Sequence, residues 1–197
     1  LMKRYPDNYF HLAIIDPPYG IETKGNAQDR FNMGKDLTLI NDAKPSVEYF
    51  NQLFRVSKSQ IIWGYNHLSD MLPSCREFVF WYKHQPVPTF SDGELAWTSF
   101  TKTAKCFDYP YYKANIDNRT NDSKIHPTQK PVKLYEWLLM NYANEGDKIL
   151  DTHLGSGSIS LACHNLGFDL TGCELDKEYF DAACKRLKQH QAQLTMF

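Results

Sequence analysis

Hydrophobic residues along this chain come in short runs that end at Gly, Pro or Asp, a pattern typical of strands. Strands are predicted at 12–15, 60–64, 78–82, 94–100, 104–109, 148–150 and 169–173. Apolar residues spaced three and four positions apart predict helices from Ser46, from Pro131, over 158–166 and over 176–193. The alternation of strands and helices predicts an α/β fold in one domain spanning residues 1–197.

Two segments lack a hydrophobic period. Residues 21–45 are rich in Gly, Asn, Asp and Lys and predict a long mobile loop, which in a compact domain is usually functional. A polar stretch over 113–125 closes the middle section of the chain. These segments are candidates for contacting a substrate.

Composition narrows the class of protein. With 42% hydrophobic and 23% charged residues, the chain of 197 residues is globular and long enough to bury a core. Its apolar runs are too short to span a bilayer, so a soluble cytoplasmic protein without membrane contact is expected. Five cysteines without a CxxC pair indicate neither disulfides nor zinc, and no metal site is predicted. The net charge of −1 leaves room only for a local basic surface.

A glycine-rich segment, Asp151-Thr-His-Leu-Gly-Ser-Gly-Ser158, follows a predicted strand and opens a helix, where open α/β sheets bind ligands. Gly155 and Gly157 let the backbone approach a ligand closely. Glu174 ends the next strand, where its carboxylate can accept both hydroxyl protons of a ribose. Because Ser160 replaces the third glycine of a dinucleotide fingerprint, a nucleoside cofactor without a diphosphate is favoured. A tight turn with a surface glutamate is the alternative.

The segment Asp16-Pro-Pro-Tyr-Gly20 also ends a strand, so its groups should project at the same sheet edge. An exocyclic amine of a nucleobase becomes nucleophilic when two acceptors hold its hydrogens and free its lone pair from the ring. The Asp16 carboxylate and the carbonyl of Pro17, in a stiff segment, can supply these acceptors. Tyr19 offers an aromatic face to an unstacked base. A chain-breaking turn without chemistry is the alternative.

A third segment, His126-Pro-Thr-Gln-Lys-Pro131, leads into a predicted helix. Thr128 can cap that helix. Lys130 is a cation near a helix start, where the helix dipole disfavours a positive charge. It is therefore expected to pair with a carboxylate. The methionyl carboxylate of a sulfonium cofactor is one candidate, although a His and a Lys in a loop are often simply solvated.

Together the three segments resemble the amino-methyltransferases of DNA, which transfer a methyl group from S-adenosyl-L-methionine to adenine N6 or cytosine N4. The range 16–19 matches their catalytic motif, 154–157 their cofactor motif, Glu174 their ribose-binding acid and 126–131 their helix-leading motif. The catalytic motif comes first, as in the permuted beta group. The resemblance implies a doubly wound mixed sheet of the Rossmann-like methyltransferase fold.

The resemblance also implies site residues and partners. The predicted catalytic residues are Asp16, Pro17, Pro18 and Tyr19. The predicted cofactor-binding residues are Asp16, His126, Thr128, Lys130, Asp151, His153, Gly155, Ser156, Gly157, Ser158 and Glu174. The expected partner is double-stranded DNA in a prokaryotic or phage-infected cell, and a homodimer and a companion restriction nuclease are compatible with the family.

The chain departs from the family at Thr152-His153, where Pro-Phe is usual, so the apolar wall beside the cofactor is altered. The candidate target-recognition section, about 85–125, is short. Residues 99–133 carry seven lysines and arginines against three aspartates, interleaved with aromatic residues, a pattern suited to phosphate contact and base stacking.

The resemblance predicts an S-adenosylmethionine-dependent DNA methyltransferase. Its expected target is adenine N6, because Asp at the first motif position is commoner among adenine enzymes of the family. Cytosine N4 methylation and a non-catalytic DNA-binding relative are the alternatives. Methylation of RNA or of a protein amide is a third reading, and Asp16 counts against the amide because its analogues carry Asn-Pro-Pro-Tyr.

Overall fold

The computed structural model describes residues 1–20, 43–85, 91–110, 125, 126 and 128–194. Most of the predicted loop 21–45 and much of the target-recognition section 85–125 therefore lie outside the described residues. The described part contains a seven-stranded sheet in the order β5-β3-β4-β2-β1-β6-β7. The strands are β1 (Phe10–Ile15), β2 (Ser57–Trp63), β3 (Phe78–Tyr82), β4 (Gly93–Thr98), β5 (Lys105–Asp108), β6 (Lys148–Asp151) and β7 (Asp169–Gly172).

The sheet is mixed, as predicted. Strand β4 runs antiparallel to both of its neighbours, β2 and β3, whereas the β1–β2, β1–β6, β6–β7 and β3–β5 pairs are parallel. The carboxyl ends of six strands and the amino end of β4 consequently meet at one edge of the sheet. We call it the catalytic edge, because the predicted catalytic motif follows β1 there.

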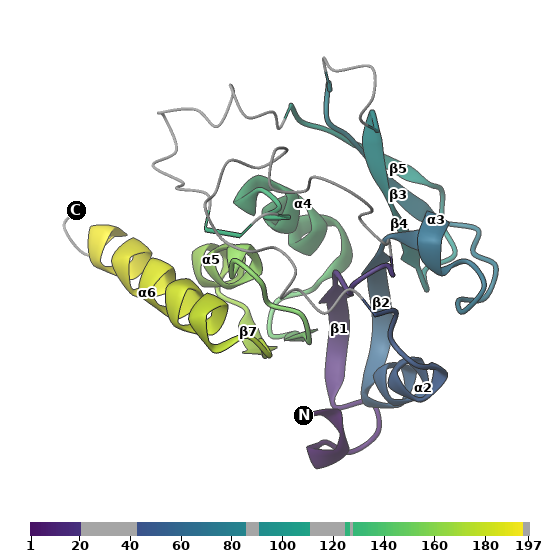
Figure 1. Ribbon diagram of the computed structural model, residues 1–197, viewed down its shortest axis with the longest axis horizontal. Coiled ribbons are helices and arrows are strands. Elements are labelled where there is room, and N and C mark those ends of the chain that lie inside the picture. The colour runs from purple at the N-terminus through teal and green to yellow at the C-terminus, as the bar shows by residue number, and fades with distance from the viewer. Residues whose placement is uncertain (21–42, 86–90, 111–124, 127, 195–197) are drawn as a thin grey trace.

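Helices cover both faces of the sheet (Figure 1). The helices are η1 (Met2–Arg4), α2 (Val47–Val56), α3 (Tyr65–Leu68), α4 (Val132–Tyr142), α5 (Ser158–Leu166) and α6 (Lys177–Leu194). On one face, α4 and α5 pack on Leu12, Ile14 and Ile149. On the other face, α2 and α3 pack on Ala13 and Ile15. The alternating faces of β1 thus serve two separate cores, and the doubly wound fold is confirmed.

The structure extends the predicted elements at a few places. Strand β2 begins at Ser57, directly after α2 ends at Val56, whereas the predicted strand began at residue 60. The first residues of β2 are polar, so the hydrophobic pattern did not include them. Ser57 is buried there, and its hydroxyl donates to Leu53 O at 2.6 Å. Val47, which belongs to the apolar spacing that predicted α2, is 63% exposed in the first turn. The short helix α3 was not predicted.

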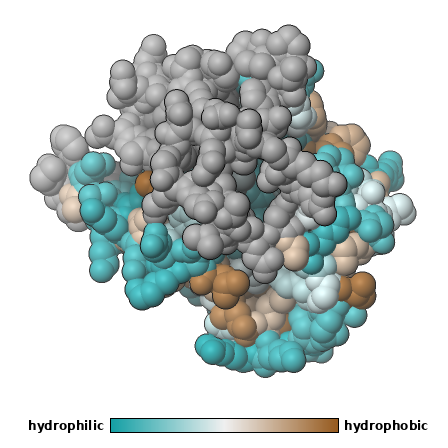
Figure 2. All heavy atoms as spheres, viewed as in Figure 1, coloured by the Kyte–Doolittle hydropathy of each residue, from teal (hydrophilic) through white to brown (hydrophobic). Residues whose placement is uncertain are grey.

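The surface is mostly polar over α6, where Figure 2 shows hydrophilic residues along the helix. Leu175, just before this helix, is an exception and is 91% exposed. Within the described residues, no helix has the length and apolar character needed to cross a membrane.

Candidate active site

The topology brings the three predicted motifs to the catalytic edge. Asp16 follows β1, Asp151 ends β6 beside it, and Glu174 lies two residues beyond β7. The helix-leading segment reaches the same place, because the ring of His126 lies near Gly155, 3.7 Å from the position a Cβ would take there. Segments more than a hundred residues apart in the sequence are therefore neighbours.

Both oxygens of the Asp16 carboxylate accept hydrogen bonds from side chains. The Tyr19 hydroxyl donates to Oδ1, and Lys130 Nζ donates to Oδ2. Pro17 is buried next to Asp16, and Pro18 is half-buried. The predicted catalytic motif thus brings its tyrosine and its aspartate into direct contact.

The Tyr19 ring lies in a tight slot. It stacks on His67, with ring centroids 5.3 Å apart and planes 15° apart. A Cβ added to Gly64, which has φ of +79°, would lie 2.0 Å from Tyr19 Cε1, so only glycine leaves room for the ring. Burial raises the pKa of Tyr19 well above 10, and the charges of Asp16 and Glu94 raise it further. The hydroxyl therefore stays protonated and can donate.

Lys130 is only 4% exposed and lies between two carboxylates. It pairs with Asp16 and lies 3.1 Å from Glu94 Oε2, while Lys83 pairs with Glu94 Oε1. The carboxylate partners of Lys130 in the structure are thus the protein's own residues, Asp16 and Glu94. Burial raises the pKa of Glu94, but the charges of Lys130 and Lys83 outweigh it and lower that pKa to about 2.

The glycine-rich loop is bound to the end of β7. The Gly155 amide donates to Glu174 Oε2 at 2.8 Å, and the amides of Leu175 and Asp176 donate to Oε1 at 2.7 and 3.0 Å. Oε1 accepts two of these bonds and Oε2 accepts one, so Glu174 retains acceptor capacity on Oε2. Gly157 has φ of +70°, and its close neighbour is Ala183 of α6, 2.9 Å from the position of an added Cβ. The need for glycine at 157 comes from helix packing.

The two serines of the loop direct their hydroxyls into the protein. Ser156 Oγ lies 3.0 Å from Ser158 Oγ, and both side chains are buried. Arg186 of α6 donates to Ser156 O at 2.9 Å and to Ser158 Oγ at 3.0 Å. These hydroxyls hold the loop in shape.

The helix-leading segment differs from the prediction in one respect. Helix α4 begins at Val132 with Pro131 at its N-cap and no side-chain capping bond, so the prediction that Thr128 caps this helix is wrong. The Thr128 amide instead donates to His126 Nδ1 at 3.3 Å. The His126 ring also packs edge-on against Tyr179 of α6, with centroids 4.4 Å apart.

Asp151 and His153 lie at the start of the glycine-rich segment, and the His153 amide donates to Asp151 Oδ1. Asp151 is 2% exposed, and burial raises its pKa to about 7, although the bond from the His153 amide lowers it. Burial also lowers the pKa of His153, so the ring is neutral at pH 7. Tyr49 of α2 faces both altered family positions: its hydroxyl lies 2.5 Å from Thr152 Oγ1 and 3.4 Å from His153 Nδ1. A polar partner thus accompanies the Thr-His pair.

Sequence reasoning missed Glu94, His67, Tyr49 and Arg186 as residues of this region. The signal for Glu94 was a carboxylate at the start of an otherwise apolar strand, directly after the turn at 91–93. Its place at the catalytic edge follows from the antiparallel direction of β4, which the sequence pattern does not reveal.

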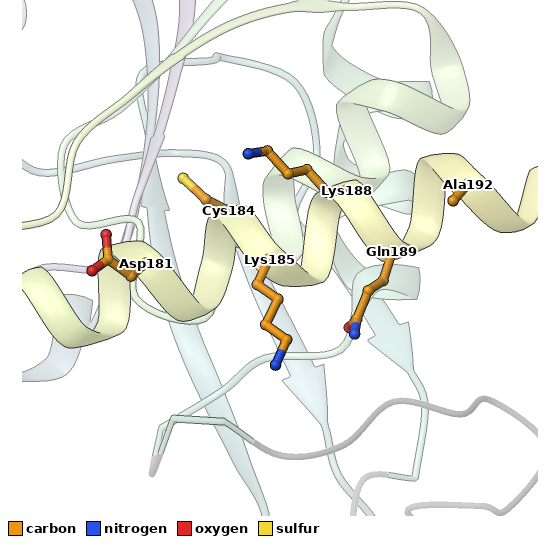
Figure 3. Close-up of a pocket in the computed structure, with 6 residues that line it drawn as sticks. All are labelled: Asp181, Cys184, Lys185, Lys188, Gln189 and Ala192. Atoms are coloured by element: carbon orange, nitrogen blue, oxygen red, sulfur yellow. The ribbon is translucent and has the colours of Figure 1, made fainter.

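A hollow elsewhere on the surface is lined, among the described residues, by side chains of α6 (Figure 3). Its lining residues are Asp181, Cys184, Lys185, Lys188, Gln189 and Ala192. None of the predicted site residues lines this hollow, so the catalytic edge remains the candidate active site.

A family model described as DNA methylase matches residues 57–185, which is more than half of the chain. The chain belongs to this family of DNA methylases. The methylase is 43% identical to the type II methyltransferase M2.DpnII of Streptococcus pneumoniae, over 95% of this chain and 85% of that protein. It is 28% identical to the type II methyltransferase M.HpaI of Haemophilus parainfluenzae, over 94% of this chain and 70% of that protein.

Solved structures agree with this assignment. The methylase resembles the crystal structure of the M1.HpyAVI–SAM complex with a TM-score of 0.57 and 26% identity, covering 91% of this chain and 90% of that one. It resembles the PvuII cytosine-N4-specific DNA methyltransferase with a TM-score of 0.62 and 16% identity, covering 93% and 81%. The second likeness concerns the fold alone.

Proposed function

We propose that this methylase transfers a methyl group from S-adenosyl-L-methionine to adenine N6 of a base flipped out of double-stranded DNA. The observation that carries the proposal is the contact between motifs at the catalytic edge, where Asp16, Lys130 and Tyr19 form one hydrogen-bonded group. Membership of the DNA methylase family supports the chemistry and the DNA substrate.

The residues around Glu174 fit a nucleoside cofactor. Three backbone amides hold the Glu174 carboxylate in one orientation, and the lone pair that remains on Oε2 suits a ribose hydroxyl. The exposed Leu175 beside it offers an apolar surface to a purine ring. The solved M1.HpyAVI–SAM complex is a similar chain with this cofactor bound. Bound S-adenosylmethionine supplies the electrophilic methyl group.

Asp16 prepares the amine. Its carboxylate accepts a hydrogen of the exocyclic amino group, and the Pro17 carbonyl accepts the other, so that the nitrogen lone pair is directed out of the base plane. Lys130 donates to Asp16 Oδ2 and so holds the carboxylate in place beside the amine. Methyl transfer forms the N–C bond as the sulfonium S–C bond breaks, and the amine proton leaves to Asp16 or to water.

Tyr19 holds the flipped base. His67 already lies parallel to the Tyr19 ring, which is the geometry that a stacked base adopts. Assignment of the base to adenine rests on the family resemblance at Asp16, since both amines can use the same two acceptors.

The test is a methyl-transfer assay with labelled S-adenosylmethionine and mixed-sequence duplex DNA, followed by nucleoside mass analysis. N6-methyladenine is the expected product. N4-methylcytosine alone would overturn the base assignment and leave the mechanism in place. If folded protein that binds the cofactor forms no methylated nucleoside in this assay, the proposed activity is overturned.

A further inference from the structure

Four charged side chains alternate in sign from β3 to the catalytic aspartate. Lys83 pairs with Glu94, Glu94 lies against Lys130, and Lys130 pairs with Asp16. None of the four side chains is more than 27% exposed, and Lys130 is 4% exposed. We call these residues the charge cluster. The described contacts give it two positive and two negative groups, which balance.

We propose that Glu94 is a positioning residue for methyl transfer, which holds the Lys130 ammonium in place so that Lys130 in turn orients the Asp16 carboxylate. This inference rests on the proposed function of Asp16. Glu94 acts through Lys130, because it is Lys130 that contacts both carboxylates.

The geometry explains why one carboxylate is not enough. Asp16 accepts from Tyr19 and Lys130 already, and in the reaction it must also accept from the base amine. A buried cation needs compensating charge from nearby groups. Glu94 supplies that charge without occupying the acceptors of Asp16. Without Glu94, Lys83 would lose its carboxylate partner, Lys130 would keep only Asp16, and the cluster would carry a net charge of +1.

The protonation of Lys130 reflects this balance. Burial lowers the pKa of Lys130, but the charges of Asp16 and Glu94 outweigh burial and raise the pKa above its ordinary value of 10.5. Removal of Glu94 must therefore lower the pKa of Lys130. The sign is fixed, because the charge removed is negative and the group that titrates is a cation.

Other groups near the cluster titrate elsewhere. Burial raises the pKa of Asp151 to about 7, and Lys130 opposes this rise. Burial raises the pKa values of Tyr19 and Tyr135 well above 10. Lys130 Nζ also lies 5.4 Å from the ring centroid of Trp63, and this ring does not titrate. None of these groups accounts for an alkaline loss of rate that appears only in a Glu94 variant, and the lysine signals described below assign such a loss to Lys130.

The experiment compares single-turnover methyl transfer across pH in Glu94→Gln and in the parent. The parent rate is expected to stay level to about pH 10, since Lys130 remains protonated. The rate of Glu94→Gln is expected to fall about tenfold for each pH unit above the lowered pKa of Lys130. Glu94→Asp, which keeps the charge, should retain the level profile and also serves if Glu94→Gln does not fold.

A second change separates charge from packing. Glu94→Gln combined with Lys83→Met removes one negative and one positive charge and so restores the charge balance. In this double variant the loss of methyl-transfer rate at alkaline pH should shift to higher pH, toward the profile of the parent. A purely structural Glu94 predicts that the double variant is worse than the single one. Glu136→Gln is the matched control, because Glu136 also accepts from a lysine, Lys133, but lies on α4. Its pH profile should equal that of the parent.

A readout without turnover distinguishes this proposal from the proposed function. NMR of protein labelled at lysine Cε, assigned by loss of a signal in Lys130→Met, gives the pKa of Lys130 directly. A fall of that pKa in Glu94→Gln and its recovery in the double variant support positioning even if the parent methylates no DNA. An unchanged pKa, or an unchanged rate profile in an active parent, would overturn it.

Discussion

The Gly155 amide donates to Glu174 Oε2 at 2.8 Å, which joins the glycine-rich loop after β6 to the end of β7. The bond links two residues that sequence spacing alone placed at adjacent strand ends. It also fixes the carboxylate for which we propose a ribose partner. If the proposal holds, loop shape and cofactor binding depend on the same side chain.

Glu174→Gln is expected to weaken S-adenosylmethionine binding at least about tenfold, since a hydrogen bond to a charged group is worth about 1.5–3 kcal/mol. The variant loses the negative charge, and its single oxygen cannot serve both the Gly155 amide and the amides of Leu175 and Asp176, so the acceptor proposed for the ribose is neutral and less firmly held. Calorimetric titration measures the effect, with Glu178→Gln, at an exposed position of α6, as control. Equal affinities in Glu174→Gln and the parent would remove the ribose assignment.

Asp16→Ala separates chemistry from binding. Cofactor affinity should stay within a few-fold of the parent, whereas single-turnover transfer should fall about a hundredfold or more, because an acceptor aimed at the reacting amine is worth about 3 kcal/mol in the transition state. Asp70→Ala, which removes an exposed aspartate paired with Lys44, should transfer at the parental rate. Near-parental transfer by Asp16→Ala would show that Asp16 only forms a turn.

Gly64→Ala tests the slot that holds Tyr19. The added Cβ would lie 2.0 Å from Tyr19 Cε1 and must displace the ring, so transfer should fall about a hundredfold, as a misplacement of about 1 Å can cause. Gly146→Ala is the matched control: Gly146 has φ of +83° but nothing within 4 Å of an added Cβ. Both variants should lose about 1–2 kcal/mol of stability from the left-handed backbone. Similar transfer rates in the two variants would contradict a role for the Tyr19 position.

The sequence predicted the motifs better than it predicted their contacts. Asp16 and Asp151 could be placed at the catalytic edge because each ends an apolar strand followed by a turn. Glu94 could not, since its place at this edge depends on β4 running antiparallel, and an apolar run looks the same in either direction. The carboxylate partner of Lys130 was expected, but its identity depends on the packing of three distant segments.

Asp151 makes stability depend on pH. Its pKa is raised to about 7 by burial, whereas in the unfolded chain the carboxyl ionises near its ordinary value of 3.8. The unfolded state therefore loses this proton first as the pH rises, and between about pH 4 and about pH 7 the folded state loses stability from this group, by about 4 kcal/mol at most. Asp151→Asn removes this term and keeps an oxygen that can accept from the His153 amide at its present distance of 2.9 Å.

The measurement is urea unfolding of the parent and Asp151→Asn at several pH values from about 4 to about 8. The difference in unfolding free energy should change in favour of the variant as the pH rises, and should level off above about pH 7, where Asp151 is ionised in both states. Asp169→Asn, which removes an exposed carboxylate from the neighbouring strand β7, controls for the loss of a charge. A constant difference between parent and Asp151→Asn across this range would mean that Asp151 is ionised in the folded protein at low pH. In that case the buried carboxyl would have to be stabilised as an anion by Lys130, whose charge lowers the pKa of Asp151.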